Sequence, residues 1–153
     1  MSIFLWKISK IVFSNALDAN RLTNLTSISF GNFNTSNVTD MSCMFCCDSL
    51  TSLNLSNFNT SKVTDMSYMF EDCISLTSLN LSSFDMSRVT NTDSMLGGCS
   101  ALTEIKTPKA IGSAAVKLPA KQGYSWVDKN NTSTKYTLIN SANVGKTLIR
   151  KAN

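Results

Sequence analysis

The chain has 153 residues, 42% of them hydrophobic, which predicts a single folded domain with its own core. It contains no histidine, and this excludes Ser/His/Asp and Cys/His catalytic arrangements and the usual histidine-bearing metal sites. The net charge of +4 is unevenly divided: residues 1–101 hold five basic and eight acidic side chains, whereas residues 102–153 hold nine basic and two acidic ones.

Residues 1–24 are expected to form an N-terminal cap or a partial repeat. The stretch SIFLWKISKIVF is apolar, but Lys7 and Lys10 interrupt it and no small-residue cleavage site follows. It is also too short to cross a membrane. We therefore expect neither a signal peptide nor a membrane-spanning segment, and we expect the chain to be a piece of a longer exported protein.

Residues 25–107 repeat one pattern about three times. Copies begin at Leu25, Leu50 and Leu76, and a fourth begins at Leu102 and then fades. Self-similarity of 25–26 residues built on L-x-x-L-x-L predicts a leucine-rich-repeat solenoid, because one coil buries its apolar face only against the next coil. The other repeated apolar positions are Ile28, Leu53, Leu79 and Ile105; Phe30, Leu55 and Leu81; Phe33, Phe58 and Phe84; Val38, Val63 and Val89; Met44, Met69 and Met95; Phe45, Phe70 and Leu96; and Cys47, Cys73 and Cys99.

Each copy is expected to contain a short strand and a helical turn. Leu53 and Leu55 alternate with polar residues, as in a strand with one buried face. Apolar residues then recur at intervals of three and four, at Met66, Met69, Phe70 and Cys73, which predicts a helical turn. Thr64 or Asp65 is its expected N-cap. The predicted fold class is therefore α/β: an array of short parallel strands and helical turns, followed by a small β-rich cap.

Residues 108–153 are expected to form that β-rich C-terminal cap. The segments 123–127 and 134–139 suggest a hairpin, and 145–151 suggests a further strand. Because this end of the chain is basic, it is the expected contact if the chain binds an anionic polymer; the alternative is that its scattered lysines form an ordinary solvated face. The candidate binding residues are Lys117, Lys121, Trp126, Lys129, Lys135, Tyr136 and Lys146. Basic and aromatic residues do not interleave as in nucleic-acid modules, so no nucleic-acid partner is expected.

The repeat resembles that of the BspA-type leucine-rich-repeat surface proteins. The resemblance rests on LTSLNLSNFNTSKVTDMSYMFEDCIS at residues 50–75, above all on V-T-D-M-S-x-M-F, and it covers residues 25 to about 107. It implies a protein at the cell surface or secreted by bacteria or parasitic protists, in a family where some members are adhesins for host matrix proteins. It also implies that the repeated cysteines lie in a stack rather than in disulfide bridges.

Two other motifs have a structural and a functional interpretation. The C-x-x-C of Cys43 and Cys46 lacks a second pair of ligands, so burial is expected rather than a metal or redox site. The strand face presents small side chains without Trp, Tyr or Arg, which makes it a poor surface for tight protein recognition. Its residues are Ser27, Ser29, Ser52, Asn54, Ser78 and Asn80.

The expected function is a non-enzymatic surface module for adhesion or protein interaction. No catalytic residue, cofactor or metal site is predicted, because no acid, base and nucleophile converge in the pattern. The alternative is a structural spacer that holds another part of a larger surface protein away from the cell and has no ligand of its own.

Overall fold

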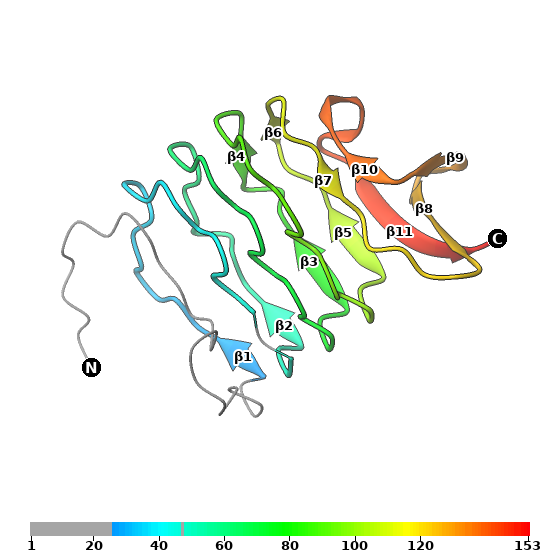
Figure 1. Ribbon diagram of the computed structural model, residues 1–153, viewed down its shortest axis with the longest axis horizontal. Helices are drawn as coiled ribbons and strands as arrows, with labels where there is room; N and C mark the ends of the chain where they lie inside the picture. Colours follow the sequence, from blue (N-terminus) through cyan, green and yellow to red (C-terminus); the bar gives the residue numbers. More distant parts are fainter. Residues whose placement is uncertain (1–25, 47) are drawn as a thin grey trace.

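The computed structural model describes residues 26–46 and 48–153. The expected N-terminal cap at 1–24 lies outside the described residues, as do Leu25 and Cys47. Figure 1 shows the copies of the repeat side by side from β1 to β5, and the C-terminal strands gathered beyond them. The strands are β1 Ser27–Ile28, β2 Ser52–Leu53, β3 Ser78–Asn80, β4 Asp85–Met86, β5 Glu104–Lys106, β6 Ala110–Ile111, β7 Val116–Lys117, β8 Tyr124–Asp128, β9 Asn131–Tyr136, β10 Leu138–Ile139 and β11 Thr147–Ala152.

Backbone hydrogen bonds join successive copies, and in each of the following the N–H donates to the residue just before its equivalent in the next copy. Met41 N–H donates to the carbonyl of Asp65 at 2.9 Å, and Phe45 N–H donates to Met69 at 2.8 Å. Phe70 N–H donates in the same way to Met95 at 3.0 Å. Each copy therefore satisfies the peptide groups of its neighbour, as buried backbone requires.

The helical turn expected in each copy of the repeat is absent from the described copies, because these inter-copy hydrogen bonds use the donors that a helix would need. An α-helix directs each N–H to the carbonyl four residues earlier. The segment 66–73 instead forms turns, in which Tyr68 and Asp72 have φ values of 58° and 56°. Such left-handed residues interrupt a right-handed helix. The sole helical element among the described residues is η1, a 3-10 helix at Ser141–Asn143.

The α/β leucine-rich-repeat solenoid predicted from the repeat is therefore wrong. The described residues are nearly all β-strand and turn, and their strands fall into four separate sheets rather than one continuous parallel sheet. β1 pairs only with β2 and β4 pairs with β6, both in parallel, while β7 and β10 form an antiparallel pair. The sequence pattern identified the apolar positions, but it did not specify whether the backbone N–H groups bond within a copy or to the next copy.

The repeated apolar positions nevertheless form the core, as predicted. Val63, Met69, Phe70 and Cys73 have no exposed surface, and their equivalents in the third copy are at most 1% exposed. Four predicted positions differ from this expectation, because they are only half-buried and pack against the core: Ile28, Phe30, Phe33 and Leu53. The phenyl rings of Phe45 and Phe70 stack at 5.4 Å between centroids, which extends the core from one copy to the next.

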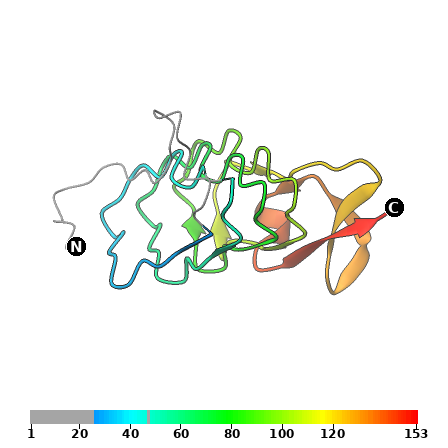
Figure 2. The same cartoon turned by 90° about the horizontal axis from the view of Figure 1, so that it is seen from below.

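The C-terminal strands join the last copy in a mixed sheet of order β3-β5-β11-β8-β9. β3 and β5 are parallel, whereas β11 runs antiparallel to both β5 and β8. The expected hairpin is present as β8 and β9, with a register shift between Val127 and Asp128. Figure 2 shows β11 running from the repeat region out to the hairpin, so this strand connects the two parts of the described chain.

Candidate functional site: a cationic pocket

Five of the seven predicted binding residues line one pocket of about 310 Å³. We call it the cationic pocket, and we define it by Lys117, Lys121, Trp126, Lys135, Tyr136 and Arg150. Leu118, Pro119 and Ala120 supply apolar lining, and no carboxylate is among its lining residues. The structure thus brings together, around one small concave surface, cations that lie between residues 117 and 150 of the sequence.

Antiparallel strand pairing explains why distant residues meet at this pocket. Arg150 of β11 lies opposite Trp126 of β8, and Trp126 lies opposite Tyr136 of β9. The three side chains therefore form one row across the sheet, because directly opposed residues project from the same face. Lys117 ends β7, and the segment after it closes the pocket from the side.

Arg150 is the pocket residue that the sequence did not suggest. Its Nη1 donates to the carbonyl of Ser100 at 2.9 Å and its Nη2 donates to that of Pro119 at 3.2 Å, while its Nε is buried without a hydrogen-bond partner. Its guanidinium carbon lies 5.0 Å from the centroid of the Trp126 ring, which is cation–π distance. Desolvation lowers the pKa of Arg150, although a guanidinium stays charged at neutral pH.

The aromatic residues give the pocket rigid walls. Trp126 is 4% exposed, and its indole Nε1 donates to the carbonyl of Pro119 at 2.9 Å. Tyr124 is exposed, and the ammonium of Lys121 lies 5.2 Å from its ring centroid. Because Arg150 and Pro119 hold the indole in place, Trp126 acts as a wall of the pocket rather than as a free stacking surface.

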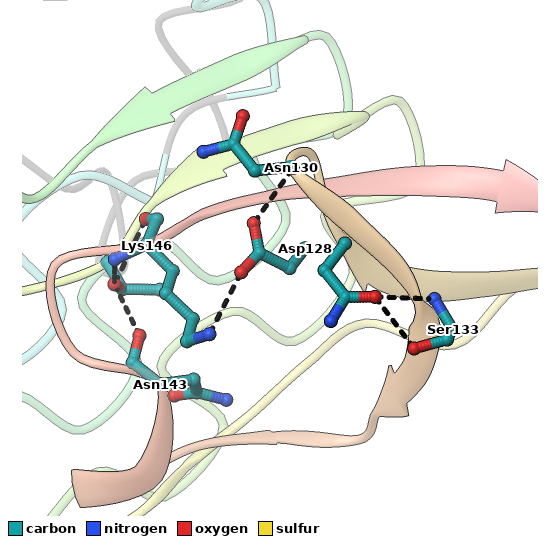
Figure 3. Close-up of polar contacts among 7 residues, drawn as sticks. Asp128, Asn130, Ser133, Asn143 and Lys146 are labelled. Atoms are coloured by element: carbon teal, nitrogen blue, oxygen red, sulfur yellow. Dashed lines mark hydrogen bonds and ion pairs between the residues drawn. The ribbon is translucent and has the colours of Figure 1, made fainter.

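Lys129 and Lys146 do not belong to the cationic pocket. Lys129 pairs with Glu104 at 3.0 Å, and both side chains are well exposed. Lys146 donates to Asp128 at 2.9 Å, as Figure 3 shows, and Asp128 also accepts a hydrogen bond from Asn130 N–H at 3.0 Å. The Lys146 hydrogen bond, followed by that from Asn130, lowers the pKa of Asp128 below its usual value of 3.8. These two lysines therefore have structural partners within the chain.

The strand face carries only a minor hollow of about 190 Å³, lined by Leu53, Asn54, Leu55, Ser56, Asn80, Ser82 and Ser83. Asn54 and Asn80 use their side-chain oxygens to accept the N–H groups of Ser56 and Ser82. Such local contacts stabilise turns, and they leave few side-chain hydrogen-bonding groups for a ligand. As the sequence predicts, this face offers small uncharged groups.

The described cysteines divide into two pairs: Cys43 and Cys46, expected to be buried, are only half-buried, whereas Cys73 and Cys99 lie in the core. Cys73 and Cys99 are buried, and the half-buried Cys46 donates to the carbonyl of Tyr68 at 3.2 Å. Burial raises the pKa of both Cys46 and Cys99 to about 12, so neither is a thiolate at neutral pH. Within residues 26–46 and 48–153, no three His, Cys, Asp or Glu side chains are grouped so that they could hold a metal ion.

The arrangement can therefore bind anions, through fixed cations around an apolar-floored pocket. Nearby, a second hollow of about 400 Å³ shares the wall formed by residues 117–120 and is lined on its other side by residues 94 and 96–100. In the described part of the chain, no helix has both the length and the apolar character needed to cross a membrane.

Comparison with known proteins gives one match. The family described as "Mycoplasma protein of unknown function, DUF285" matches residues 7–113, which include the repeat and end before the cationic pocket. A search of curated proteins finds no match, and a search of solved structures finds none either. Since the matched residues make up more than half of the sequence, the chain belongs to the family of Mycoplasma proteins of unknown function named DUF285.

Proposed function

We propose that this chain is a non-enzymatic interaction module of a cell-surface or secreted protein, and that it attaches to anionic polymers or to matrix proteins that carry anionic groups. The observation that carries the proposal is the cationic pocket, in which Lys117, Lys121, Lys135 and Arg150 surround one hollow without a carboxylate. The likeness of the repeat to BspA-type surface proteins supports the cellular location and the role in adhesion.

Charge supports the choice of partner. Residues 102–153 carry nine of the fourteen basic side chains, and only two of these nine, Lys129 and Lys146, form ion pairs among the described residues. Unpaired cations raise the local concentration of an anionic partner and speed its association. The pocket lysines are therefore expected to determine both the rate and the salt dependence of binding.

A binding assay with the full chain tests the proposal. Matrix proteins and anionic glycans are immobilised, and binding is measured from about 0.01 M salt, where charges act over ~30 Å, to about 1 M, where they act over ~3 Å. We expect binding at low salt, its loss at high salt, and weaker binding when Lys117, Lys121 and Lys135 are changed to glutamine.

A second variant controls for the strand face. Replacing Ser52 and Asn54 by tryptophan blocks that face and leaves the charge unchanged, so we expect binding to persist. Loss of binding in this variant alone would instead place the contact on the strand face. If the intact chain binds no polymer and no matrix protein, the spacer function is favoured, as the small uncharged side chains of the strand face already suggest.

A further inference from the structure

The cationic pocket contains a guanidinium whose charge has no counter-ion among the described residues. The guanidinium of Arg150 donates to the neutral carbonyls of Ser100 and Pro119. The two ion pairs of the described residues lie elsewhere, at Lys129 with Glu104 and at Lys146 with Asp128. Partial burial of an arginine charge costs free energy unless an anion offsets it.

The guanidinium is also held in one orientation before any ligand arrives. Its two carbonyl contacts and the Trp126 ring fix its plane, and β11 is paired on both sides, with β5 and with β8. Each Nη nitrogen carries a second N–H beyond the one already used. A fixed guanidinium favours a planar or tetrahedral oxyanion such as carboxylate or sulfate, because little side-chain entropy is lost on binding.

The size and lining of the pocket indicate the kind of ligand molecule to which that anionic group is attached. A volume of about 310 Å³ is at the lower end of ligand sites, so it accommodates one ring with its substituents. Leu118 and Pro119 provide an apolar floor and Thr137 adds a hydroxyl group, while the Ser125 hydroxyl at the pocket already donates to Oδ1 of Asn153. A sugar ring presents apolar C–H faces and several hydroxyls, and it matches this mixture of surfaces.

Other anionic ligands fit the pocket less well. A nucleobase needs a free aromatic face, yet Arg150 covers the Trp126 ring and Lys121 lies over that of Tyr124. A peptide strand needs unpaired backbone groups, yet β8 and β11, which carry Trp126 and Arg150, are each paired on both sides. The pocket therefore favours side-chain recognition of a compact ring.

We infer that the cationic pocket binds one acidic sugar unit, with its carboxylate or sulfate against Arg150 and its ring over Leu118 and Pro119. The three pocket lysines, Lys117, Lys121 and Lys135, contact neighbouring anionic groups of the same glycan. This inference rests on the proposed function, since it names the chemical group that the module recognises.

The test compares two triple variants with equal loss of charge. One changes Lys117, Lys121 and Lys135 to glutamine, and the other changes Lys106, Lys109 and Lys151, which do not line the pocket. Affinity is measured for heparin, which carries sulfate and carboxylate, for hyaluronan, which carries carboxylate alone, and for linear polyphosphate and neutral dextran. The first two probes distinguish the two anionic groups.

We expect the pocket variant to lose affinity for the acidic glycans by about tenfold or more, equivalent to about 1.4 kcal/mol, and the control variant to lose much less. Arg150→Gln should lose binding while Arg150→Lys retains part of it, after circular dichroism has shown that each is folded. An acidic disaccharide should also shift the indole N–H resonance of Trp126, a readout that needs no variant.

The outcomes separate this inference from the proposed function. Equal weakening by the two triple variants, or competition by polyphosphate as strong as by heparin, would show binding by overall charge and overturn the sugar site alone. An unmoved Trp126 resonance at saturating disaccharide would overturn it too. Failure of the intact chain to bind any anionic polymer or matrix protein would overturn both proposals.

Discussion

The thiol of Cys99 donates a hydrogen bond to the main-chain carbonyl of Phe70 at 3.1 Å, which ties one copy of the repeat to the copy before it. Cys73 makes the equivalent contact with Phe45 at 2.8 Å. The repeated spacing of these cysteines within the chain thus has a role in packing and in backbone pairing, because a buried carbonyl needs a donor.

The first prediction concerns these thiols. Cys73 and Cys99 should react with a thiol reagent far more slowly in the native protein than in the unfolded one, because both are buried and the raised pKa of Cys99, about 12, leaves little thiolate at neutral pH. Peptide mapping after labelling measures each cysteine individually, so that the labelling of Cys47 is not counted with that of Cys73 and Cys99. Native labelling of Cys99 as fast as in denaturant would contradict the hydrogen-bonded stack.

The second prediction concerns the core under β3. Leu79 is 2% exposed, whereas its neighbour Ser78 is exposed. Leu79→Ala should lower the free energy of unfolding by about 2 to 5 kcal/mol, because the cavity is closed in by the adjacent copies. Ser78→Ala should change it by no more than about 0.5 kcal/mol. Urea denaturation measures both, and equal midpoints would refute the assignment of Leu79 to the core.

The third prediction concerns a buried threonine between two copies. The Thr60 hydroxyl donates to the carbonyl of Asp85 at 2.9 Å and accepts from the Asp85 N–H at 2.9 Å. Thr60→Val keeps the shape but leaves both backbone groups unpaired, so it should destabilise by about 1 to 3 kcal/mol. Thr77→Val, at an exposed side chain, is the matched control and should have little effect on the unfolding midpoint.

The fourth prediction concerns the acid stability of the Asp128–Lys146 pair. The pKa of Asp128 is lowered from 3.8 in the folded chain, so its contribution to stability is present above its unfolded pKa and is lost as pH falls through the folded value. The pKa of Lys146 is raised by the same hydrogen bond, and its contribution is lost only as pH rises through its folded value, above 10.5. Stability should therefore fall below about pH 4.

Urea unfolding between neutral pH and about pH 2 checks this expectation. Asp128→Asn should flatten the decline, since an amide does not titrate. Glu104→Gln removes the exposed partner of Lys129 and should leave the acid dependence close to that of the parent chain. A decline unchanged by Asp128→Asn would assign the acid sensitivity to other carboxylates.

The sequence predicted the core better than the backbone. Positions such as Val63, Met69 and Phe84 were identified from spacing alone and are buried, because the repeat fixes which side chains face inward. The spacing of Met66, Met69, Phe70 and Cys73 suggested a helix, but the same spacing occurs in turns whose N–H groups bind the next copy. The spacing of apolar residues indicates which side chains are buried, but it does not indicate which carbonyl accepts the hydrogen bond of each backbone N–H.

The candidate site was predicted in part. The basic C-terminal composition indicated Lys117, Lys121 and Lys135, which line the cationic pocket. It could not separate them from Lys129 and Lys146, because the ion pairs with Glu104 and Asp128 depend on tertiary structure. Arg150 was missed because its place beside Trp126 follows from the register of β11 on β8. An aromatic residue and an arginine 24 positions apart give no local signal.

The position of β11 has a consequence for how the chain folds during synthesis. This strand lies between β5 and β8, so the five-stranded sheet remains split until residues 147–152 emerge from the ribosome. Until then the pairing edges of β5 and β8 on either side of the gap are open, and open edges recruit strands from other chains. The copies of the repeat pair with their neighbours in order, whereas the cationic pocket is complete only when Arg150, near the end of the chain, reaches Ser100 and Pro119. The nascent chain therefore passes through a stage in which its repeats are formed but the cationic pocket is not.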